Sequence, residues 1–292
     1  MEVVEAIVFR LVKAGTVEHA AADAKARRTM TDNPETIPTD TRWAHHSAQL
    51  VDGLGLATEP VAVWLLRPAD DPAPFAGFDA AASLRFCQAL MRARHGDSVL
   101  VQPSRLACPA AARAFGFRDL PPALESGEAL VGFGIVSDAA TGRTMFEAMP
   151  RLAAGALVAV AAAPLAKAPR SPDVIVVEGP PEALMWLALA DLNRAGGVRR
   201  HGDTAVLQAT CVDATIVPYL EQRLNFSLGC YGCREATDLG PEETVLGFPV
   251  AHLDGLVDAL ERLRATAMPR SRAKKPYEAL LRARASAGDR ES

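Results

Sequence analysis

The 292-residue chain has little of several features that would assign it to a special class of protein. It has no excess of basic residues, since its formal net charge is −4, and nucleic-acid-binding proteins are usually basic. Long apolar runs are missing too: the longest, residues 153–166, is interrupted by Pro164, whereas a membrane helix needs about 20 apolar residues. The N-terminus reads Met-Glu-Val-Val-Glu, without the basic residues of a signal peptide. We therefore expect a cytoplasmic protein that binds neither nucleic acid nor membrane.

Cysteine is scarce and odd in number, with five residues, which is unlike the dense, even framework of a small secreted disulfide protein. Aromatic residues make up only 5% of a chain that is 49% apolar, so we expect an aliphatic globular core. Motifs of common enzyme classes are also missing. Gly132-x-Gly134 lacks the third glycine and the basic residue of a phosphate-binding loop, and no serine-nucleophile signature is present.

Apolar periodicity divides the chain into three regions. Residues 1–43 are predicted to form an N-terminal helical arm and linker, residues 44–268 an α/β body, and residues 269–292 a basic polar tail. The arm is expected to pack on the body or on a second copy of the chain, which would give a homodimer. Within the body we predict strands at 60–66, 98–101, 172–177 and 205–209, and helices at 83–95, 108–116, 182–194 and 253–263; residues 155–163 fit either state.

The fold class is therefore α/β, with a single compact body. A His-Gly-Asp triplet at 95–97 and again at 201–203 precedes a predicted strand and then a cysteine each time. If these triplets mark a repeat, two similar α/β halves build the body.

The cysteines occupy positions where α/β proteins often place functional groups. Cys108 and Cys211 each follow a predicted strand and precede a helix, and ligands gather at the carboxyl ends of strands in α/β sheets. Cys230 and Cys233 lie in the glycine-rich segment 228–234, and Cys87 is near the start of its helix.

Three chemistries compete for these thiols. A zinc site with four cysteines normally uses two close pairs, whereas only Cys230 and Cys233 are close in sequence. A redox dithiol would use that same pair, but a helix should then begin within it, and Gly229 and Gly232 predict a loop. An iron–sulfur cluster tolerates ligands from distant segments, and a proline often follows a ligand cysteine, as Pro109 follows Cys108.

A set of short motifs occurs in a fixed order along most of the chain: Gly55-Leu56, Pro60 to Val63, Cys87 to Leu90, Cys108 to Ala111, Ser126 to Glu128, Ala163 to Leu165, Pro172 to Val174, Cys211, and Leu228 to Arg234. In these motifs the chain resembles the uncharacterised prokaryotic family named domain of unknown function 169 (DUF169). The resemblance implies that Cys87, Cys108, Cys211 and Cys230 form the recurrent set, with Cys233 as an extra cysteine. Four such positions favour a four-iron, four-sulfide (4Fe-4S) cluster, with zinc as the alternative. The family implies no activity.

Two further residues are candidates for catalytic roles. Arg234 follows the cysteine turn, where its guanidinium could hold an anionic substrate, offset the charge of a thiolate-ligated cluster, or form a plain salt bridge. Glu128 is either a helix cap or an acid–base group. Two hypotheses follow. In the first, the cluster supports redox or sulfur chemistry on a small anionic molecule, with an electron-transfer partner. In the second, the cysteines hold metal in a non-catalytic structural, sensor or carrier protein.

Overall fold

The computed structural model describes residues 39–80, 82–197, 201–202 and 207–272, together with residues 279 and 282. Most of the predicted arm and tail lie outside these residues, so the helical arm, a homodimer built through it and the polar tail stay predictions. Helix α2 (Thr39–Leu54) spans the predicted boundary at residue 44. Its apolar side chains, Trp43, Leu50 and Leu54, are buried in the body.

The seven described strands form one sheet in the order β2-β3-β4-β1-β5-β7-β6. Neighbouring strands are antiparallel except β2 and β3, which are parallel. The strands are β1 (Val61–Leu66), β2 (Asp79–Ala80), β3 (Val99–Val101), β4 (Ala159–Pro164), β5 (Val174–Gly179), β6 (Asn225–Ser227) and β7 (Thr244–Pro249). The predicted strands at 60–66, 98–101 and 172–177 are confirmed, and the ambiguous segment 155–163 contains a strand.

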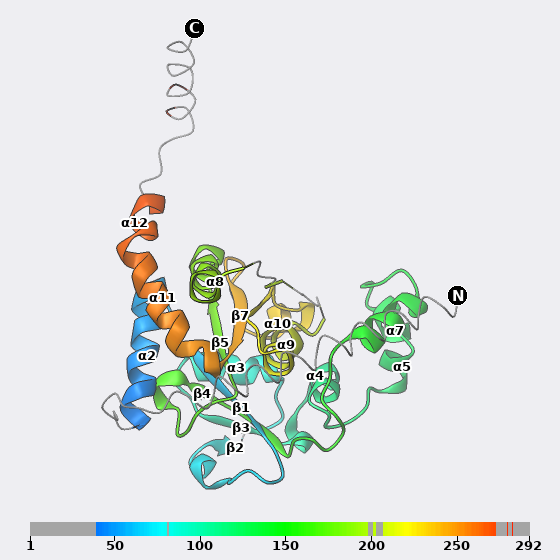
Figure 1. Cartoon of the computed structure of the whole chain (residues 1–292). Helices are drawn as coiled ribbons and strands as arrows, with labels where there is room; N and C mark the ends of the chain where they lie inside the picture. Colours follow the sequence, from blue (N-terminus) through cyan, green and yellow to red (C-terminus); the bar gives the residue numbers. More distant parts are fainter. Residues whose placement is uncertain are drawn as a thin grey trace, which may run out of the picture. The chain divides into compact units, whose positions relative to one another are not determined.

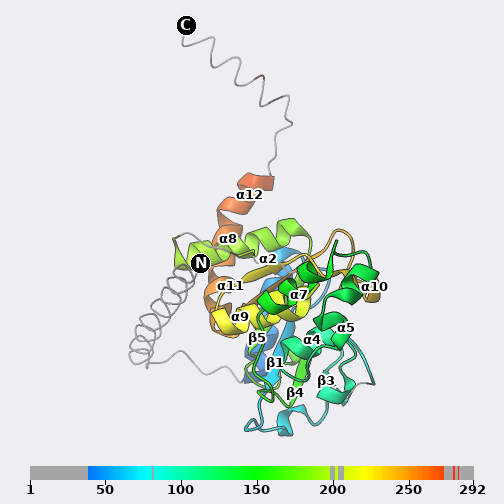
Figure 2. The same ribbon diagram turned by 90° about the vertical axis from the view of Figure 1, so that its right-hand side faces the viewer.

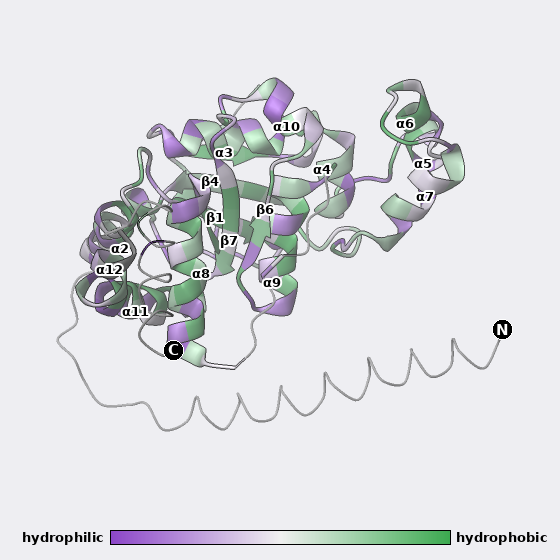
Figure 3. Ribbon diagram, turned by 90° about the horizontal axis from the view of Figure 1, so that it is seen from above, coloured by the Kyte–Doolittle hydropathy of each residue, from purple (hydrophilic) through white to green (hydrophobic). Residues whose placement is uncertain are grey.

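Helices cover both faces of this sheet (Figure 1). Alternate residues of β1 show why: Val61, Val63 and Leu65 belong to one apolar cluster, and Ala62, Trp64 and Leu66 to another. Because successive strand side chains point to opposite faces, a continuous apolar run is buried only if both faces are covered. Figure 3 shows the strands in hydrophobic colours between the helices.

One face of the sheet packs against α2, α8 and α11, and the other against α3, α4 and the π-helix η4. The α-helices after α2 are α3 (Phe86–Arg94), α4 (Pro109–Ala114), α5 (Pro122–Glu125), α6 (Glu128–Gly132), α7 (Ala139–Ala148), α8 (Pro181–Ala195), α9 (Val217–Glu221), α10 (Tyr231–Ala236), α11 (Leu253–Ala265) and α12 (Ala267–Arg272). The remaining turns are the 3₁₀ helices η1 (Ala73–Phe75), η2 (Pro103–Arg105), η3 (Leu165–Lys167) and η5 (Val250–His252), and the π-helix η4 (Ala209–Ile216).

The predicted α/β class and compact body are confirmed. The described elements do not support two similar halves, because α3 and α8, which would correspond in a repeat, pack on opposite faces of the sheet. Among the described residues, no helix is both long and apolar enough to cross a membrane.

Helices α5, α6 and α7 lie together (Figure 3; α5 and α7 are also labelled in Figure 2) and form a small unit with its own apolar cluster of Leu120, Leu130 and Phe146. Gly127 lets α6 approach α7 closely: it has a φ of +86°, and a Cβ there would overlap the carbonyl oxygen of Ala139. Ala110 and Leu207 from the body pack against this cluster. The unit is thus held beside the start of α4 and the residues that precede η4.

Candidate functional site

All five cysteines lie on one face of the sheet and have free thiols. Cys87, Cys211 and Cys233 are buried in the apolar cluster of that face, and Cys108 and Cys230 are half-buried against it. The five come from four separate segments, since Cys87 lies in the first turn of α3, Cys108 caps α4, Cys211 lies in η4, and Cys230 and Cys233 belong to α10. The fold therefore brings together the four predicted ligand cysteines and the extra one.

Cys211, Cys108 and Cys230 form a group of electrostatically interacting thiols. Burial raises the pKa of Cys211 well above the ordinary value of a thiol, and the charges of Cys108, Cys230 and Asp213 raise it further. Cys211 is 5% exposed, so its thiolate would gain little from water. The thiol of Cys211 is therefore neutral at physiological pH unless a cation offsets the charge of its thiolate.

Cys233 connects Cys230 to Cys87. The hydrogen bond with Cys230 lowers the pKa of Cys233, but the hydrogen bond with Cys87 and burial outweigh it and raise that pKa to about 12. The pKa of Cys230 is also raised strongly, first by its side-chain hydrogen bond with Cys233 and then by burial. The thiol of Cys230 accepts hydrogen bonds from the backbone N–H groups of Cys233 and Ala209, which ties α10 to the start of η4.

Cys211 lies within a π-helix rather than after a strand. The prediction of a strand over 205–209 is wrong at Ala209, where η4 already begins, and residues 203–206 lie outside the described part of the chain. Every residue of η4 is buried, and its wide turn is closed by Thr215 Oγ1, which donates to the carbonyl of Thr210 at 2.8 Å. π-Helical turns are rare and occur frequently at functional sites. The π-helix thus places Cys211 in the core beside Cys108 and Cys230.

Gly247 of β7 allows η4 to pack this closely against the sheet. A Cβ at this position would overlap the carbonyl oxygen and the Cα of Ala214. The side-chain amide of Asn225, fully buried on β6, donates to the Asp213 carbonyl at 2.9 Å. Strand β7 therefore supplies the space that the π-helix needs, and the edge strand β6 supplies a hydrogen bond.

A cavity of about 480 Å³ lies beside the thiols. Four cysteines line it, and Cys211 is not among the lining residues. Apolar side chains from the α5–α7 unit form much of the remaining wall, and the charged lining residues are Arg85 and Glu235. The complete lining is Arg85, Cys87, Ala107, Cys108, Pro109, Ala110, Leu124, Leu130, Phe133, Ile135, Phe146, Leu207, Cys230, Tyr231, Gly232, Cys233 and Glu235.

Arg234 and Glu128, the predicted catalytic residues, do not line this cavity. The guanidinium of Arg234 donates to three backbone carbonyls, those of Leu228, Gly240 and Glu243, at 2.6 to 3.0 Å. It therefore fixes the segment around α10. Glu128 is exposed in the first turn of α6, where its backbone N–H lies 3.4 Å from the hydroxyl of Ser126. Their predicted roles in substrate binding and acid–base chemistry stay predictions without a supporting contact.

Sequence reasoning missed Arg85, the cationic residue that does line the cavity. Its Nη1 donates to the carbonyl of Gly232 at 2.7 Å and lies 3.8 Å from the carboxylate of Glu235. Its position two residues before Cys87 was the only signal in the sequence. That signal does not distinguish Arg85 from other arginines, because Gly232 and Glu235 lie almost 150 residues further along the chain.

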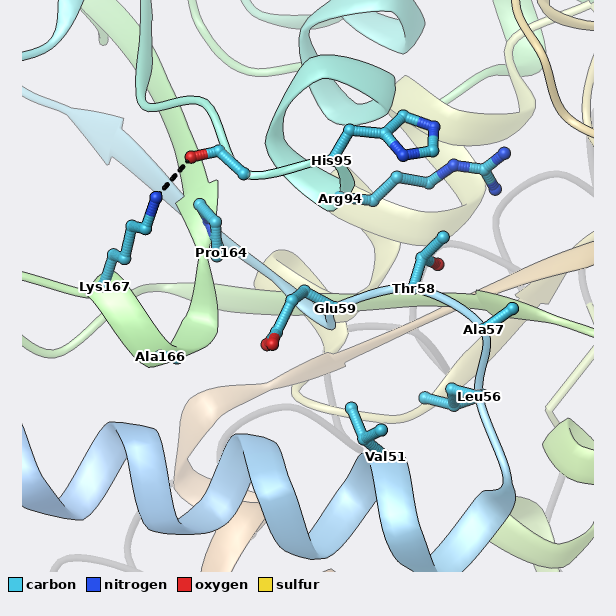
Figure 4. A pocket seen from close by; sticks show the side chains of 11 residues that line it. Val51, Leu56, Ala57, Thr58, Glu59, Arg94, His95, Pro164, Ala166 and Lys167 are labelled. Carbon is cyan, nitrogen blue, oxygen red and sulfur yellow. Dashed lines mark hydrogen bonds between the residues drawn. The ribbon is translucent and has the colours of Figure 1, made fainter.

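A second pocket, of about 440 Å³, lies at the other end of α3 (Figure 4). Arg94 and His95 line it, and the buried guanidinium of Arg94 contacts Glu178, Glu243 and Asp238 at 3.1 to 3.3 Å. Burial raises the pKa of Glu178 to about 7, although Arg94 lowers it in part. The Nε2 of His95, the first residue of the triplet at 95–97, lies 2.6 Å from the carboxylate of Asp238. These contacts hold the segment that follows α10.

The cysteine region offers thiols as its donor groups. Among the described residues, no three or more histidine, cysteine, aspartate or glutamate side chains are arranged to hold a single metal ion. A 4Fe-4S cluster is bound by cysteine thiolates that each ligate a different iron, so its ligands do not converge on one point. The thiols beside the cavity are therefore chemically suitable ligands for a 4Fe-4S cluster.

Comparison with known proteins places the chain in a family. The model of the DUF169 family, described as "Uncharacterised ArCR", matches residues 49–259. The "Uncharacterized protein MJ0308" of Methanocaldococcus jannaschii is 31% identical over 182 residues, which cover 62% of this chain and 77% of that protein. No solved structure matches the chain. The matched range contains all five cysteines and the cavity beside them, and the chain belongs to the DUF169 family.

Proposed function

We propose that this protein binds an iron–sulfur cluster, of the 4Fe-4S type, through Cys87, Cys108, Cys211 and Cys230. The observation that carries the proposal is the meeting of these thiols, from four separate segments, in one apolar region beside a cavity. The cluster would support redox or sulfur chemistry on a small molecule. A cytoplasmic location and a separate electron-transfer partner belong to the same proposal, since thiols stay reduced in the cytoplasm.

The environment of the thiols favours metal binding over direct use of a thiolate nucleophile. Burial and neighbouring thiols raise the pKa values of Cys211, Cys230 and Cys233, so a free thiolate is rare at neutral pH. A bound cation reverses this balance because it stabilises thiolate directly. When bound, a cluster would supply one-electron transfer or, with only three protein ligands, an iron open to a substrate.

Cys233 has a supporting role in this proposal. Its backbone N–H donates to the Cys230 sulfur at 3.1 Å, and hydrogen bonds to ligand sulfurs are among the factors that set a cluster's reduction potential. That bond comes from the backbone, so it survives replacement of the Cys233 side chain.

The decisive experiment is purification without oxygen, followed by absorption spectroscopy and assays of iron, sulfide and zinc. We expect a brown protein with about four irons and four sulfides per chain, whose visible absorption is bleached by reductant. Colourless protein with stoichiometric zinc would replace the proposal with the structural-metal alternative. Colourless, metal-free protein would overturn both.

Single variants test the ligand assignment. Cys87→Ala, Cys108→Ala, Cys211→Ala and Cys230→Ala should each lower the iron and sulfide content, whereas Cys233→Ala is the matched control and should retain both. If Cys233→Ala loses the cluster and Cys87→Ala keeps it, the fourth ligand is Cys233.

A further inference from the structure

The cavity beside the thiols has two unlike walls. Cys87, Cys108, Cys230 and Cys233 contribute to one side. The α5–α7 unit contributes the apolar side, with Leu124, Leu130, Phe133, Ile135 and Phe146. A volume of about 480 Å³ is within the range of small-molecule sites, which are mostly apolar with a few placed polar groups.

Two large apolar side chains of this lining are unusually exposed. Phe133, which directly follows α6, is 67% exposed and Tyr231 of α10 is 59% exposed, although both line the cavity. Val131, two residues before Phe133, and Leu228, three residues before Tyr231, are also exposed, at 40% and 55%. Exposed apolar groups that gather at a cavity are typical of a binding site, because a ligand removes them from water.

Arg85 provides one polar anchor in this otherwise apolar lining. The contacts of its guanidinium among the described residues, with Gly232 and Glu235, both use Nη1. The edge formed by Nε and Nη2 is therefore left for a ligand, and this edge matches the two oxygens of a carboxylate. The carboxylate of Glu235 is 62% exposed and lies 3.8 Å from Nη1 of Arg85, so solvent weakens the electrostatic attraction between the two side chains.

We infer that the cavity binds a small molecule with an apolar body and a single carboxylate or similar oxyanion, the body lying against the α5–α7 wall and the anion on Arg85. In this arrangement one part of the ligand faces the thiols. The identity of this ligand as the substrate rests on the proposed function, whereas its binding does not.

The test uses a pair of probes that differ in charge. The anionic probe is 8-anilinonaphthalene-1-sulfonate, and its uncharged counterpart is N-phenyl-1-naphthylamine. Binding of both to the full-length protein is measured by isothermal titration calorimetry, with iron and sulfide determined on the same samples. Both probes should bind, and the anionic one more tightly.

Variants separate the two parts of the site. Arg85→Gln should weaken the anionic probe about tenfold and leave the neutral probe unchanged, because it removes one charge-assisted pair. Glu235→Gln should strengthen the anionic probe a few-fold. Phe133→Ser should weaken the binding of both probes.

Leu192→Ser is the matched control. Leu192 is also exposed but lies on α8, on the opposite face of the sheet, so this variant should change the affinity for neither probe. Thermal melting verifies that each variant is folded.

The inference is overturned if neither probe binds, if Arg85→Gln affects both probes equally, or if Phe133→Ser and Leu192→Ser behave alike. Probe binding by protein that contains no iron would support the inferred ligand class and contradict the cluster proposal. Protein with its full iron and sulfide content that binds neither probe would support the cluster proposal and contradict the inferred ligand class.

Discussion

The backbone N–H of Cys233 donates to the Sγ of Cys230 at 3.1 Å, so that Cys230 caps the first turn of α10. The flanking glycines predict a loop here, but a helix begins within the Cys-x-x-Cys pair. The pair therefore meets the geometric condition for a redox dithiol. It fails the electrostatic one, because burial and the neighbouring thiols raise the pKa of both cysteines.

Thiol alkylation tests this electrostatic argument. In metal-free, folded protein at pH 8, Cys230 should react with iodoacetamide at least about tenfold more slowly than a free cysteine, because the reacting species is the thiolate. The same protein in denaturant, read residue by residue by mass spectrometry, provides the reference rate. Rapid labelling of Cys230 in the folded state would instead support a reactive dithiol.

Gly247→Ala tests the packing of the π-helix. A Cβ would overlap the carbonyl of Ala214, so η4 must shift, and overpacking of this kind costs about 1–3 kcal/mol of unfolding free energy. Because Cys211 lies in η4, the variant should also lower the iron content. Gly77→Ala is a suitable control, since nothing lies within 4 Å of a Cβ at that position. Equal stability of the two variants would argue against the close approach of η4.

The raised pKa of Glu178 predicts how the stability of the fold depends on pH. Burial raises its pKa from an ordinary 4.5 to about 7, so the folded chain holds the proton more tightly than the unfolded chain. The tighter proton binding contributes about 3 kcal/mol to the free energy of unfolding. This contribution is fully present below about pH 4.5 and is lost as the pH rises to about 7. Urea denaturation of the wild type and Glu178→Gln at pH 5 and pH 8 measures it.

The Glu178→Gln variant should lose less stability than the wild type between those two pH values. Arg94→Gln is the contrasting variant, since it leaves three carboxylates near one another without their cation and should be about 3–5 kcal/mol less stable than the wild type at pH 8. An unchanged pH profile in Glu178→Gln would assign the dependence to other groups.

Arg234→Lys distinguishes a structural arginine from a substrate-binding one. The planar guanidinium reaches three backbone carbonyls, which a lysine ammonium cannot match, so the segment 228–243 should exchange its amide hydrogens faster. We expect a stability loss of about 1–3 kcal/mol. Affinity for the anionic probe should be unchanged, in contrast to Arg85→Gln. A selective loss of anion binding would return Arg234 to its predicted role.

Local patterns in the sequence determined much of this protein. The strands β1 and β5 were predictable because buried strands are short continuous apolar runs, and α3, α8 and α11 because apolar side chains recur at helical spacing. The order of the cysteine motifs likewise identified the family. Strand β7 was not predicted, since Gly247 and Pro249 interrupt its apolar run. A helix after Cys211 was expected, but its π-helical form was not, because a π-helix depends on a partner surface such as Gly247 rather than on its own residues.

Only the tertiary structure decided how the site is assembled. It grouped five cysteines from distant segments, turned Arg234 toward backbone carbonyls, and put Arg85 and the α5–α7 wall at the cavity. The physical reason is that helix and strand periodicity depends on neighbours a few residues away. The surroundings of Cys211 or Arg85 depend instead on chain segments more than 100 residues apart, which meet only when both faces of the sheet are buried.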